Sequence, residues 1–327
     1  MKSFEYTRAK TAGEAVGFLE SHPKGRFLAG GTNLLDLMKD EIMSATDLVD
    51  LTRLDLTEIR ETETGLSLGA LVKNADTANH PLVRKNYPLL SRAILSAATV
   101  QIRNMATNGG NLLQRTRCPY FYDTAMPCNK RDPGSGCGAR EGLNRTQAIF
   151  GWSEKCVAVH PSDMAVALAA LDASVRVRGP GGERVIPFAK FHRLPGDAPE
   201  RDTNLEAGEL IVAIELPKQG YASNHYYLKV RDRASYAFAL VSVAVGLELD
   251  GDAIQQVRIA MGGVAHKPWR AAEAEKFLTG KPATAANFEA AADAEMEAAK
   301  PLEHNVYKVE LGRQAIIRAL QQAATLG

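Results

Sequence analysis

The hydrophobic and polar positions of residues 1–217 change repeatedly between helix-like and strand-like periods. Thr11 and Glu14 have capping-box spacing, so a short amphipathic helix is expected to begin there. Residues 25–38 predict a strand, a glycine turn and a helix. Further strands are predicted in 47–51, 57–62 and 65–72, and a helical pattern with breaks at Pro81 and Pro88 covers 75–98.

Pro217 separates two series of predicted elements that differ in their order. Before that point, residues 160–177 predict a helix and a strand, a hairpin turns around 179–182, and 209–217 is a strand that Pro217 ends. The polar residues 218–224 mark a domain boundary. Beyond it we expect three antiparallel strands, followed by three helices: strands in 225–233, 238–249 and 254–265, and helices from Pro268, Ala286 and Tyr307.

Residues 114–158 lack any such period. They are rich in Arg, Gly, Pro, Cys and aromatic residues, so they are not expected to form long regular elements. An irregular segment of this length inside a compact domain is usually functional or disordered.

Composition limits the classes of function. The chain has 327 residues, of which 45% are hydrophobic, so two or three packed units are expected. Its 39 basic and 38 acidic residues nearly cancel, which removes the basic field that general nucleic-acid binding needs. No apolar stretch reaches the roughly 20 residues of a membrane helix, and residues 1–10 lack the apolar core of a signal peptide.

Two glycine pairs stand next to predicted helices. Glycine has no Cβ and tolerates positive φ, so backbone N–H groups at such turns can approach an anion, and a helix that begins there adds its dipole. Gly30 and Gly31 with Thr32 and Asn33 form the first pair, and 107–113 repeats the arrangement. Two such turns would suit a pyrophosphate held from both sides. Each turn alone is more typical of an ordinary strand-to-helix connection, and neither matches the Rossmann or P-loop motif.

All four cysteines lie in or beside the irregular segment, at Cys118, Cys128, Cys137 and Cys156. A chain of this length does not need disulfides for stability, and no C-x-x-C pair indicates a zinc ribbon. Four thiolates are the ligand set of a [4Fe-4S] cube, one for each iron. The spacing leaves three readings open: a [4Fe-4S] cluster, unligated reduced cysteines, or an unusual zinc site.

Several motifs resemble a known family. "FLAGGTNLLDLM", "TNGGNLL", "HPSDMAVALAALDA" and "GELIVAIELP" are similar to the FAD-binding subunits of the molybdenum hydroxylases, the xanthine oxidase family. "QRTRCPYFYDT", "PGSGC" and "GGVAHKPWR" resemble its aldehyde oxidoreductase branch. The resemblance implies an α+β fold. A two-part FAD-binding domain of the vanillyl-alcohol oxidase type would cover 1–218, and a C-terminal domain with a three-stranded antiparallel sheet and a helix bundle would cover 219–327.

The same resemblance assigns the site residues. In this branch an inserted loop, here about 114–158, holds a [4Fe-4S] cluster, so its ligands would be Cys118, Cys128, Cys137 and Cys156. The flavin pyrophosphate would be held by Phe27, Leu28, Ala29, Gly30, Gly31, Thr32, Asn33 and Leu34 on one side and by Thr107, Gly110 and Asn111 on the other. Asp163, Ile211 and Lys229 occupy positions that contact the flavin in the family. His160, close to Asp163, is expected to be structural or adjacent to the flavin.

The implied function is electron transfer, with no substrate chemistry and no catalytic residue on this chain. A molybdenum-cofactor subunit would oxidise an aldehyde to a carboxylic acid, and electrons would cross a [2Fe-2S] subunit to FAD and leave to an external acceptor such as dioxygen. The complex would be a heterotrimer. It would be periplasmic by co-export with a signal-bearing partner, or cytoplasmic. The alternatives are a subunit like that of 4-hydroxybenzoyl-CoA reductase, with electrons in the opposite direction, and a non-redox binding module with structural zinc.

Overall fold

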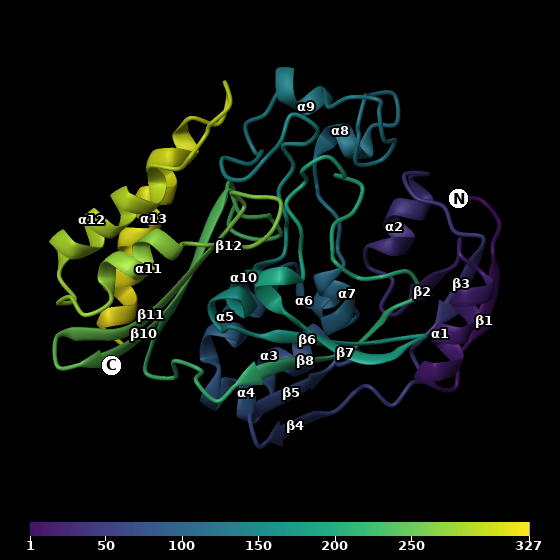
Figure 1. The fold of residues 1–327 in the computed structure, drawn as a ribbon, viewed down its shortest axis with the longest axis horizontal. Coiled ribbons are helices and arrows are strands. Elements are labelled where there is room, and N and C mark those ends of the chain that lie inside the picture. The colour runs from purple at the N-terminus through teal and green to yellow at the C-terminus, as the bar shows by residue number, and fades with distance from the viewer. Residues whose placement is uncertain (327) are drawn as a thin grey trace.

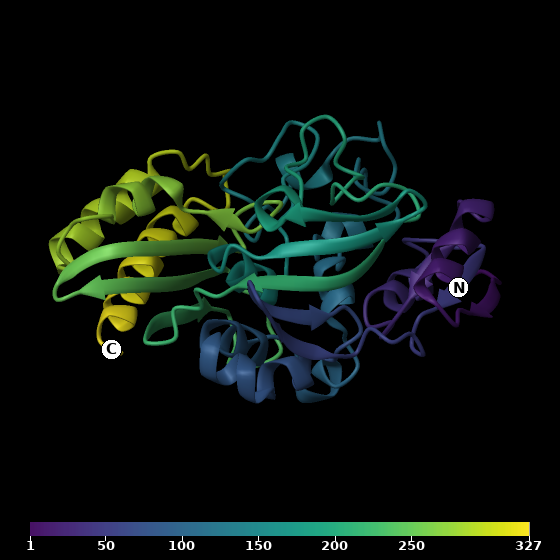
Figure 2. The same cartoon turned by 60° about the horizontal axis from the view of Figure 1, so that its bottom comes forward.

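The computed structural model describes residues 1–326 and has three β-sheets in that range. Figures 1 and 2 show them in a row, from a small N-terminal sheet through a central sheet to a C-terminal sheet. The first two sheets form the two parts of the N-terminal domain. The predicted α+β class, with a two-part domain followed by an antiparallel one, is confirmed.

The N-terminal sheet is parallel, with strand order β1–β3–β2. Thr11 caps α1 as predicted, because its Oγ accepts a hydrogen bond of 3.1 Å from the Glu14 N–H. β1 was not predicted, because its residues EYTR carry no apolar alternation and are mostly exposed. The elements are β1 (Glu5–Arg8), α1 (Ala12–Ser21), β2 (Arg26–Leu28), α2 (Leu34–Lys39) and β3 (Asp47–Asp50).

The central sheet is antiparallel, with order β4–β5–β8–β6–β7. Its core contains Leu66 and Leu68 of β5 and Leu89 and Leu90 of α5, all fully buried. Its strands are β4 (Ile59–Thr62), β5 (Gly65–Gly69), β6 (Ser174–Gly179), β7 (Gly182–Pro187) and β8 (Leu210–Pro217). Its helices are α3 (Asn74–Asn79), α4 (Pro81–Asn86), α5 (Pro88–Ser96), α6 (Val100–Arg103), α7 (Asn108–Leu112), α10 (Asp163–Ala170) and the 3₁₀ turn η1 (Phe188–Lys190).

The irregular segment leaves α7 and returns just before α10. Within it only two single-turn helices form, α8 (Pro119–Tyr122) and α9 (Gly138–Glu141). Figure 1 shows this segment, which we call the cysteine loop (residues 114–158), as a cap above α7 and α10. The prediction of an irregular region is confirmed.

The C-terminal domain is a sheet of order β12–β11–β10–β9 with three helices packed on one face (Figure 1). The sheet has four strands where three were expected, because β12 has only two residues and no alternating pattern to predict it. The strands are β9 (Asn224–Val230), β10 (Val241–Asp250), β11 (Ala253–Gly262) and β12 (Trp269–Arg270). The helices are α11 (Ala272–Leu278), α12 (Ala285–Met296) and α13 (Tyr307–Ala324).

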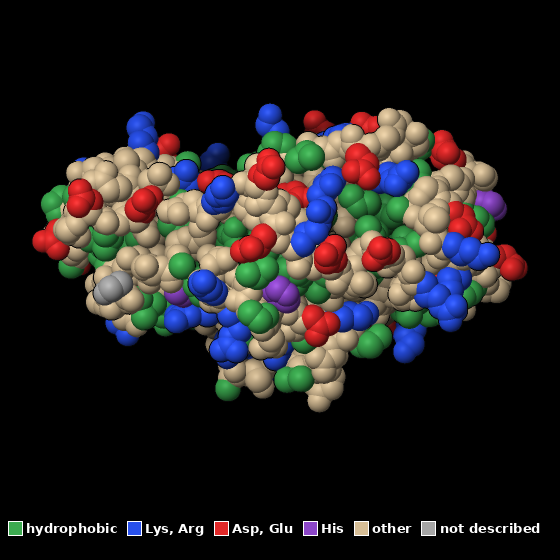
Figure 3. Space-filling model, turned by 90° about the horizontal axis from the view of Figure 1, so that it is seen from below, with side chains coloured by type: hydrophobic (Ala, Val, Ile, Leu, Met, Phe, Trp, Pro, Cys, Tyr) green, Lys and Arg blue, Asp and Glu red, His purple; other side chains and the backbone are tan. Residues whose placement is uncertain are grey.

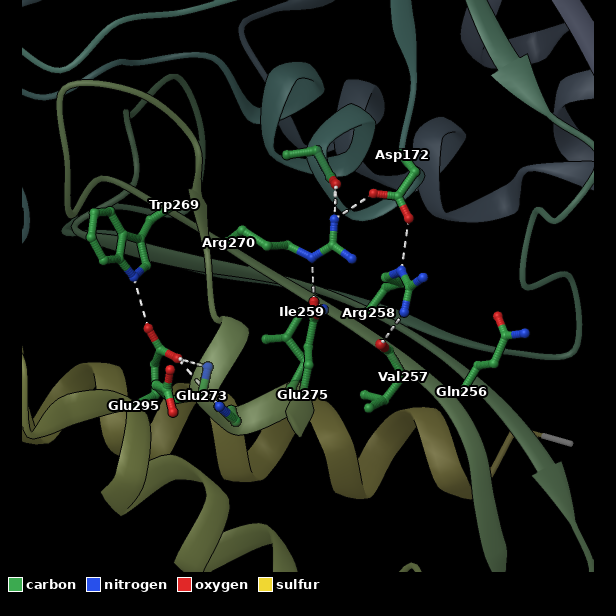
Figure 4. Close-up of polar contacts among 12 residues, drawn as sticks. Asp172, Gln256, Val257, Arg258, Ile259, Trp269, Arg270, Glu273, Glu275 and Glu295 are labelled. Carbon is green, nitrogen blue, oxygen red and sulfur yellow. Dashed lines mark hydrogen bonds and ion pairs between the residues drawn. The ribbon is translucent and has the colours of Figure 1, made fainter. Parts of the chain in front are cut away.

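A network of ion pairs joins the two domains at the end of α10. Figure 4 shows Asp172 facing Arg258 and Arg270 of the C-terminal sheet, with distances of 2.7 and 2.6 Å. Arg270 also donates to the carbonyl of Ala169 and pairs with Glu275. Asp172 has φ +50°, a left-handed conformation that aspartate tolerates better than most residues. The helix α10 is therefore fixed to both domains.

Charge is mixed over the surface. On the face in Figure 3, Lys and Arg are interspersed with Asp and Glu, consistent with the net charge of +1. This face therefore presents no extended field of one sign. Among residues 1–326, no helix is both long and apolar enough to cross a membrane.

Candidate cofactor site

A cavity of about 770 Å³ lies between the two domains, below the cysteine loop. Its size is within the range of small-molecule and cofactor pockets. Its wall comes from the first glycine turn, from α7, from the start of α10 and from the residues that connect β9 to β10. Residues far apart in the sequence thus share one cavity.

The first glycine turn reaches the cavity through Thr32 and Asn33. Gly31 has φ +72°, which favours glycine, so that part of the prediction agrees with the backbone. Gly30 is needed for a different reason: a Cβ there would stand 2.1 Å from the carbonyl oxygen of Met105. The missing side chain therefore allows the two glycine segments to pack against each other. The Nδ2 of Asn33 is buried and has no hydrogen-bond partner among the described residues.

The second glycine segment is a short helix, α7, and not the predicted open turn. Thr107 caps it, with Oγ1 accepting a 3.2 Å hydrogen bond from the Gly110 N–H. Neither Gly109 nor Gly110 has a positive φ. Gly109 is closely packed, since a Cβ there would stand 3.2 Å from the Cβ of Ala70 and 3.6 Å from that of Ile211. Of the two glycines Gly109 and Gly110, only Gly110 lines the cavity.

Asn111 connects α7 to α10. Its Nδ2 donates to Asn74 Oδ1 at 2.8 Å, and its Oδ1 accepts from the Ser162 hydroxyl at 2.5 Å. Ser162 is the N-cap of α10 and accepts from the Ala165 N–H at 2.9 Å. These hydrogen bonds fix the polar side of the cavity where α7 and α10 meet.

Asp163 and Lys229 form a buried ion pair on the cavity wall. Lys229 Nζ lies 2.8 Å from Asp163 Oδ2 and donates to the Ser96 carbonyl at 3.0 Å, and Tyr227 donates to Asp163 Oδ1 at 2.7 Å. Burial raises the pKa of Asp163, although Lys229 and Tyr227 both oppose the rise. The pair holds a carboxylate of the N-terminal domain and an ammonium of the C-terminal domain beside the same space.

The cavity borders a histidine cluster that sequence reasoning missed. His160 lines the cavity, and its ring centroid lies 4.3 Å from that of His192. His266 Nε2 is 3.9 Å from Asp202, which pairs with Lys130 and with Arg115. Burial lowers the pKa of both His192 and His266 to about 4. The three histidines are far apart in the sequence and show no ligand spacing, so no local pattern could have revealed them.

The four cysteines surround a second, much smaller cavity. Together with Lys130 they line a space of about 10 Å³, close to the room that one water needs. Cys128 and Cys137 face each other across an antiparallel bridge. Burial raises the pKa of Cys118 to about 11 and of Cys156 to about 12, so a metal would have to displace their protons. Within residues 1–326, no three His, Cys, Asp or Glu side chains are arranged to hold a single metal ion.

The two cavities share one residue, Cys118. Gln147 also lines the larger cavity, and its Nε2 donates a 3.4 Å hydrogen bond to Cys118 Sγ. The thiol pocket and the large cavity are therefore neighbours.

The sequence-predicted flavin residues divide into two groups. Six line the cavity: Thr32, Asn33, Gly110, Asn111, Asp163 and Lys229. The others stand behind that wall: Phe27, Leu28, Ala29, Gly30, Gly31, Leu34, Thr107 and Ile211. Ile211 is buried in β8 against Gly109. Direct contact with flavin stays a prediction for both groups.

The fold defines a two-domain protein with a cavity of cofactor size between its domains. Residues 2–219 match the family "FAD binding domain in molybdopterin dehydrogenase", and residues 226–323 match "CO dehydrogenase flavoprotein C-terminal domain". The chain therefore belongs to the FAD-binding subunits of the molybdenum hydroxylase, or xanthine oxidase, family. The family predicted from the sequence motifs is confirmed.

Comparisons with individual relatives agree with this family assignment. The chain is 50% identical over 325 residues to the aldehyde oxidoreductase FAD-binding subunit PaoB of Escherichia coli, with 99% of each chain covered. It is 32% identical over 280 residues to the glyceraldehyde dehydrogenase medium chain of Sulfolobus acidocaldarius, covering 85% of this chain and 82% of the relative. The solved carbon monoxide dehydrogenase of Hydrogenophaga pseudoflava has a chain with TM-score 0.77 and 28% identity, covering 99% of this chain and 98% of that one. These relatives are oxidoreductase subunits.

Proposed function

We propose that this chain is the FAD- and [4Fe-4S]-carrying electron-transfer subunit of a molybdenum-dependent aldehyde oxidoreductase. The observation that carries the proposal is the 50% identity, over almost the whole of both chains, to an aldehyde oxidoreductase subunit. The cavity between the domains and the gathering of all four cysteines support it.

The residues around the large cavity suit FAD. Bound FAD would accept electrons and pass them on, which none of the protein's own side chains can do. Thr32 and Asn33 from one side and Gly110 from the other would hold the pyrophosphate. The buried Nδ2 of Asn33 supports this, because it has no well-formed hydrogen bond among the described residues and could donate to a phosphate oxygen. Lys229 and Asp163 would lie beside the flavin and fix the charge there.

The ligand set of the cysteine pocket suits a [4Fe-4S] cluster better than zinc, although the space of about 10 Å³ between the thiols would have to widen to hold a cube. A zinc site needs several donors directed at a single point, and residues 1–326 have no such group. In a cube each thiolate binds a different iron, so the four sulfurs need not converge on one point. No carboxylate lines the pocket, and the buried ammonium of Lys130 would offset part of the thiolate charge.

The partners follow from this role. A molybdenum-cofactor subunit would oxidise the aldehyde to a carboxylic acid with water as the oxygen source. A [2Fe-2S] subunit would carry the electrons to FAD, and an external acceptor such as dioxygen would remove them. The complex would be a heterotrimer, periplasmic by co-export with a signal-bearing partner, or cytoplasmic.

A visible spectrum of the purified complex tests the cofactor assignment. We expect flavin bands, a broad iron-sulfur shoulder and bleaching of the flavin on addition of an aldehyde without acceptor. A spectrum without flavin would refute the assignment. If aldehydes left the flavin oxidised while an aromatic acyl-CoA reoxidised chemically reduced enzyme, the complex would instead be a CoA-thioester reductase.

The ligand assignment has its own test. Cys128→Ser should lower the iron and acid-labile sulfide that belong to the [4Fe-4S] cluster while FAD stays bound. Met126→Ala is the matched control, because this side chain lies in the same loop, is 43% exposed and does not line the pocket. Unchanged iron and sulfide in the Cys128→Ser complex would overturn the assignment.

A further inference from the structure

Lys308 is a fully buried lysine without a carboxylate partner. It lies on α13, none of its surface is exposed, and its ammonium forms no ion pair within residues 1–326. Its Nζ donates to three backbone carbonyls: Thr146 at 2.8 Å, Gln147 at 3.0 Å and Gly263 at 2.7 Å. Burial, assisted by repulsion from Arg145, lowers the pKa of Lys308 to about 7. An uncompensated buried charge is costly, so its position requires a reason.

The three carbonyls belong to residues that line the large cavity. The ammonium of Lys308 therefore stands directly behind the cavity wall, one residue away from the space proposed for FAD. The same wall includes Gln147, whose side chain donates to Cys118 Sγ. Lys308 is thus close to both proposed redox sites.

Holding this wall in place does not by itself require a charge. Asn305 donates through Nδ2 to the carbonyls of Gln147 at 3.1 Å and Ala148 at 3.2 Å, so a neutral amide already binds one of the carbonyls that Lys308 binds. Among the described residues, three acids line the wall, Asp36, Asp163 and Asp232, and none of them forms an ion pair with Lys308. Asp163 is paired with Lys229 and Asp232 with Arg145. The property that Lys308 adds is its positive charge.

We propose that the Lys308 ammonium is a positive charge that raises the reduction potential of the flavin in the neighbouring cavity. Two-electron reduction of a flavin with uptake of only one proton leaves a net negative charge on the ring. A cation behind the wall stabilises that reduced form, because a charge in the protein interior is screened less than one in water. This inference rests on the proposed function only in requiring bound FAD. Lys308 acts as a positioning and tuning residue, since no cofactor atom needs to touch it.

The test compares Lys308→Gln and Lys308→Met with Asn305→Ala in the complete complex. FAD content is measured first, and the flavin potential is then determined by spectroscopic redox titration at pH 6, where the Lys308 ammonium is mostly charged. Lys308→Gln removes the charge and keeps two N–H donors in place of the three that the ammonium directs at the carbonyls. Asn305→Ala removes a hydrogen bond to the same wall and leaves the charge in place.

We expect both Lys308 variants to make flavin reduction less favourable by on the order of tenfold in the equilibrium constant, about 30 mV for a two-electron couple. Asn305→Ala should stay close to the wild type. A wild-type potential in Lys308→Gln would overturn the inference, as would an equal shift in Asn305→Ala or loss of FAD from both Lys308 variants, because Lys308 would then be structural. Absence of FAD from the wild-type complex would instead refute the proposed function.

Discussion

Lowering the pH from 7 to 5 should destabilise this protein through His192 and His266, which the fold holds in the neutral state. His192 Nε2 donates to the Leu112 carbonyl and His266 Nδ1 donates to the Arg193 carbonyl, both at 2.9 Å. The other ring nitrogen of each is buried without a hydrogen-bond partner among the described residues. Burial lowers the pKa of both to about 4 from 6.5, and nearby cations add to this: Lys267 for His192, and Lys130 and Arg115 for His266.

Proton binding to the two histidines decides whether the free energy of unfolding rises or falls with pH. Below pH 6.5 the unfolded chain protonates these histidines, whereas the folded chain resists protonation until about pH 4. The contribution of these histidines to the free energy of unfolding is therefore fully present above pH 6.5 and is lost as the pH falls toward 4. Asp202 does not contribute between pH 7 and 5, because its neighbouring cations hold its pKa well below the usual range.

The two lowered pKa values set the size of the loss in the free energy of unfolding. From pH 6.5 to 5 each histidine loses about 1.4 kcal/mol per pH unit, or about 2 kcal/mol. The two together should lower the free energy of unfolding by about 4 kcal/mol if they act independently. His160 and His225, whose pKa values burial also lowers, add to this loss.

Urea unfolding at pH 7 and 5, with FAD at a fixed concentration, measures the effect. Tryptophan fluorescence is a suitable probe, since Trp152 reports on the cysteine loop and Trp269 on the C-terminal sheet. The double variant His192→Gln and His266→Gln should lose much less stability between the two pH values than the wild type. His304→Gln serves as the control, because this histidine is 37% exposed. The reasoning would be wrong if the wild type lost under about 1 kcal/mol, or if the double variant lost as much as the wild type.

Three further changes test the site and the junction. Gly30→Val should abolish FAD retention, because its Cβ would clash with Met105, whereas Gly17→Ala, with no atom within 4 Å of the new Cβ, should keep the normal ratio of FAD to protein. Lys229→Met should lower the unfolding free energy by about 3 kcal/mol by leaving a buried carboxylate unpaired, and adding Asp163→Asn should recover part of the loss in a double-mutant cycle. Arg270→Ala should cost about 1–3 kcal/mol in urea unfolding through lost charged hydrogen bonds at the domain junction; an unchanged midpoint would contradict that role.

The sequence predicts elements where a local signal exists. Thr11 and Glu14 mark the start of α1 correctly, and the prolines at 81 and 88 mark the first turns of α4 and α5, because capping and proline geometry act over a few residues. The second glycine pair misled prediction, since its glycines suggested an open turn while Thr107 caps a helix there. Here glycine serves close packing and not positive φ. Only three-dimensional contacts distinguish these two uses.

Lys308 and the histidine cluster could not be found from the sequence for another reason. Their partners come from segments more than thirty residues away, and some are backbone carbonyls, which every residue carries. A lysine near the start of an amphipathic helix is ordinarily solvated. Its burial follows from the position of the cysteine loop, which brings the carbonyls of residues 146 and 147 against α13.

The two ends of the cysteine loop explain why its thiols lie beside the large cavity. The loop leaves the central domain at Gln114 and returns at Val159 and His160, and all three residues line that cavity. Both ends of the loop are thus tied to the wall of one cavity. Asn129, whose side chain binds the Lys155 carbonyl at 2.9 Å and the N–H groups of Gly134 and Gly136, closes the loop on itself. These contacts hold the cysteine pocket beside the large cavity, with Cys118 in the wall of both.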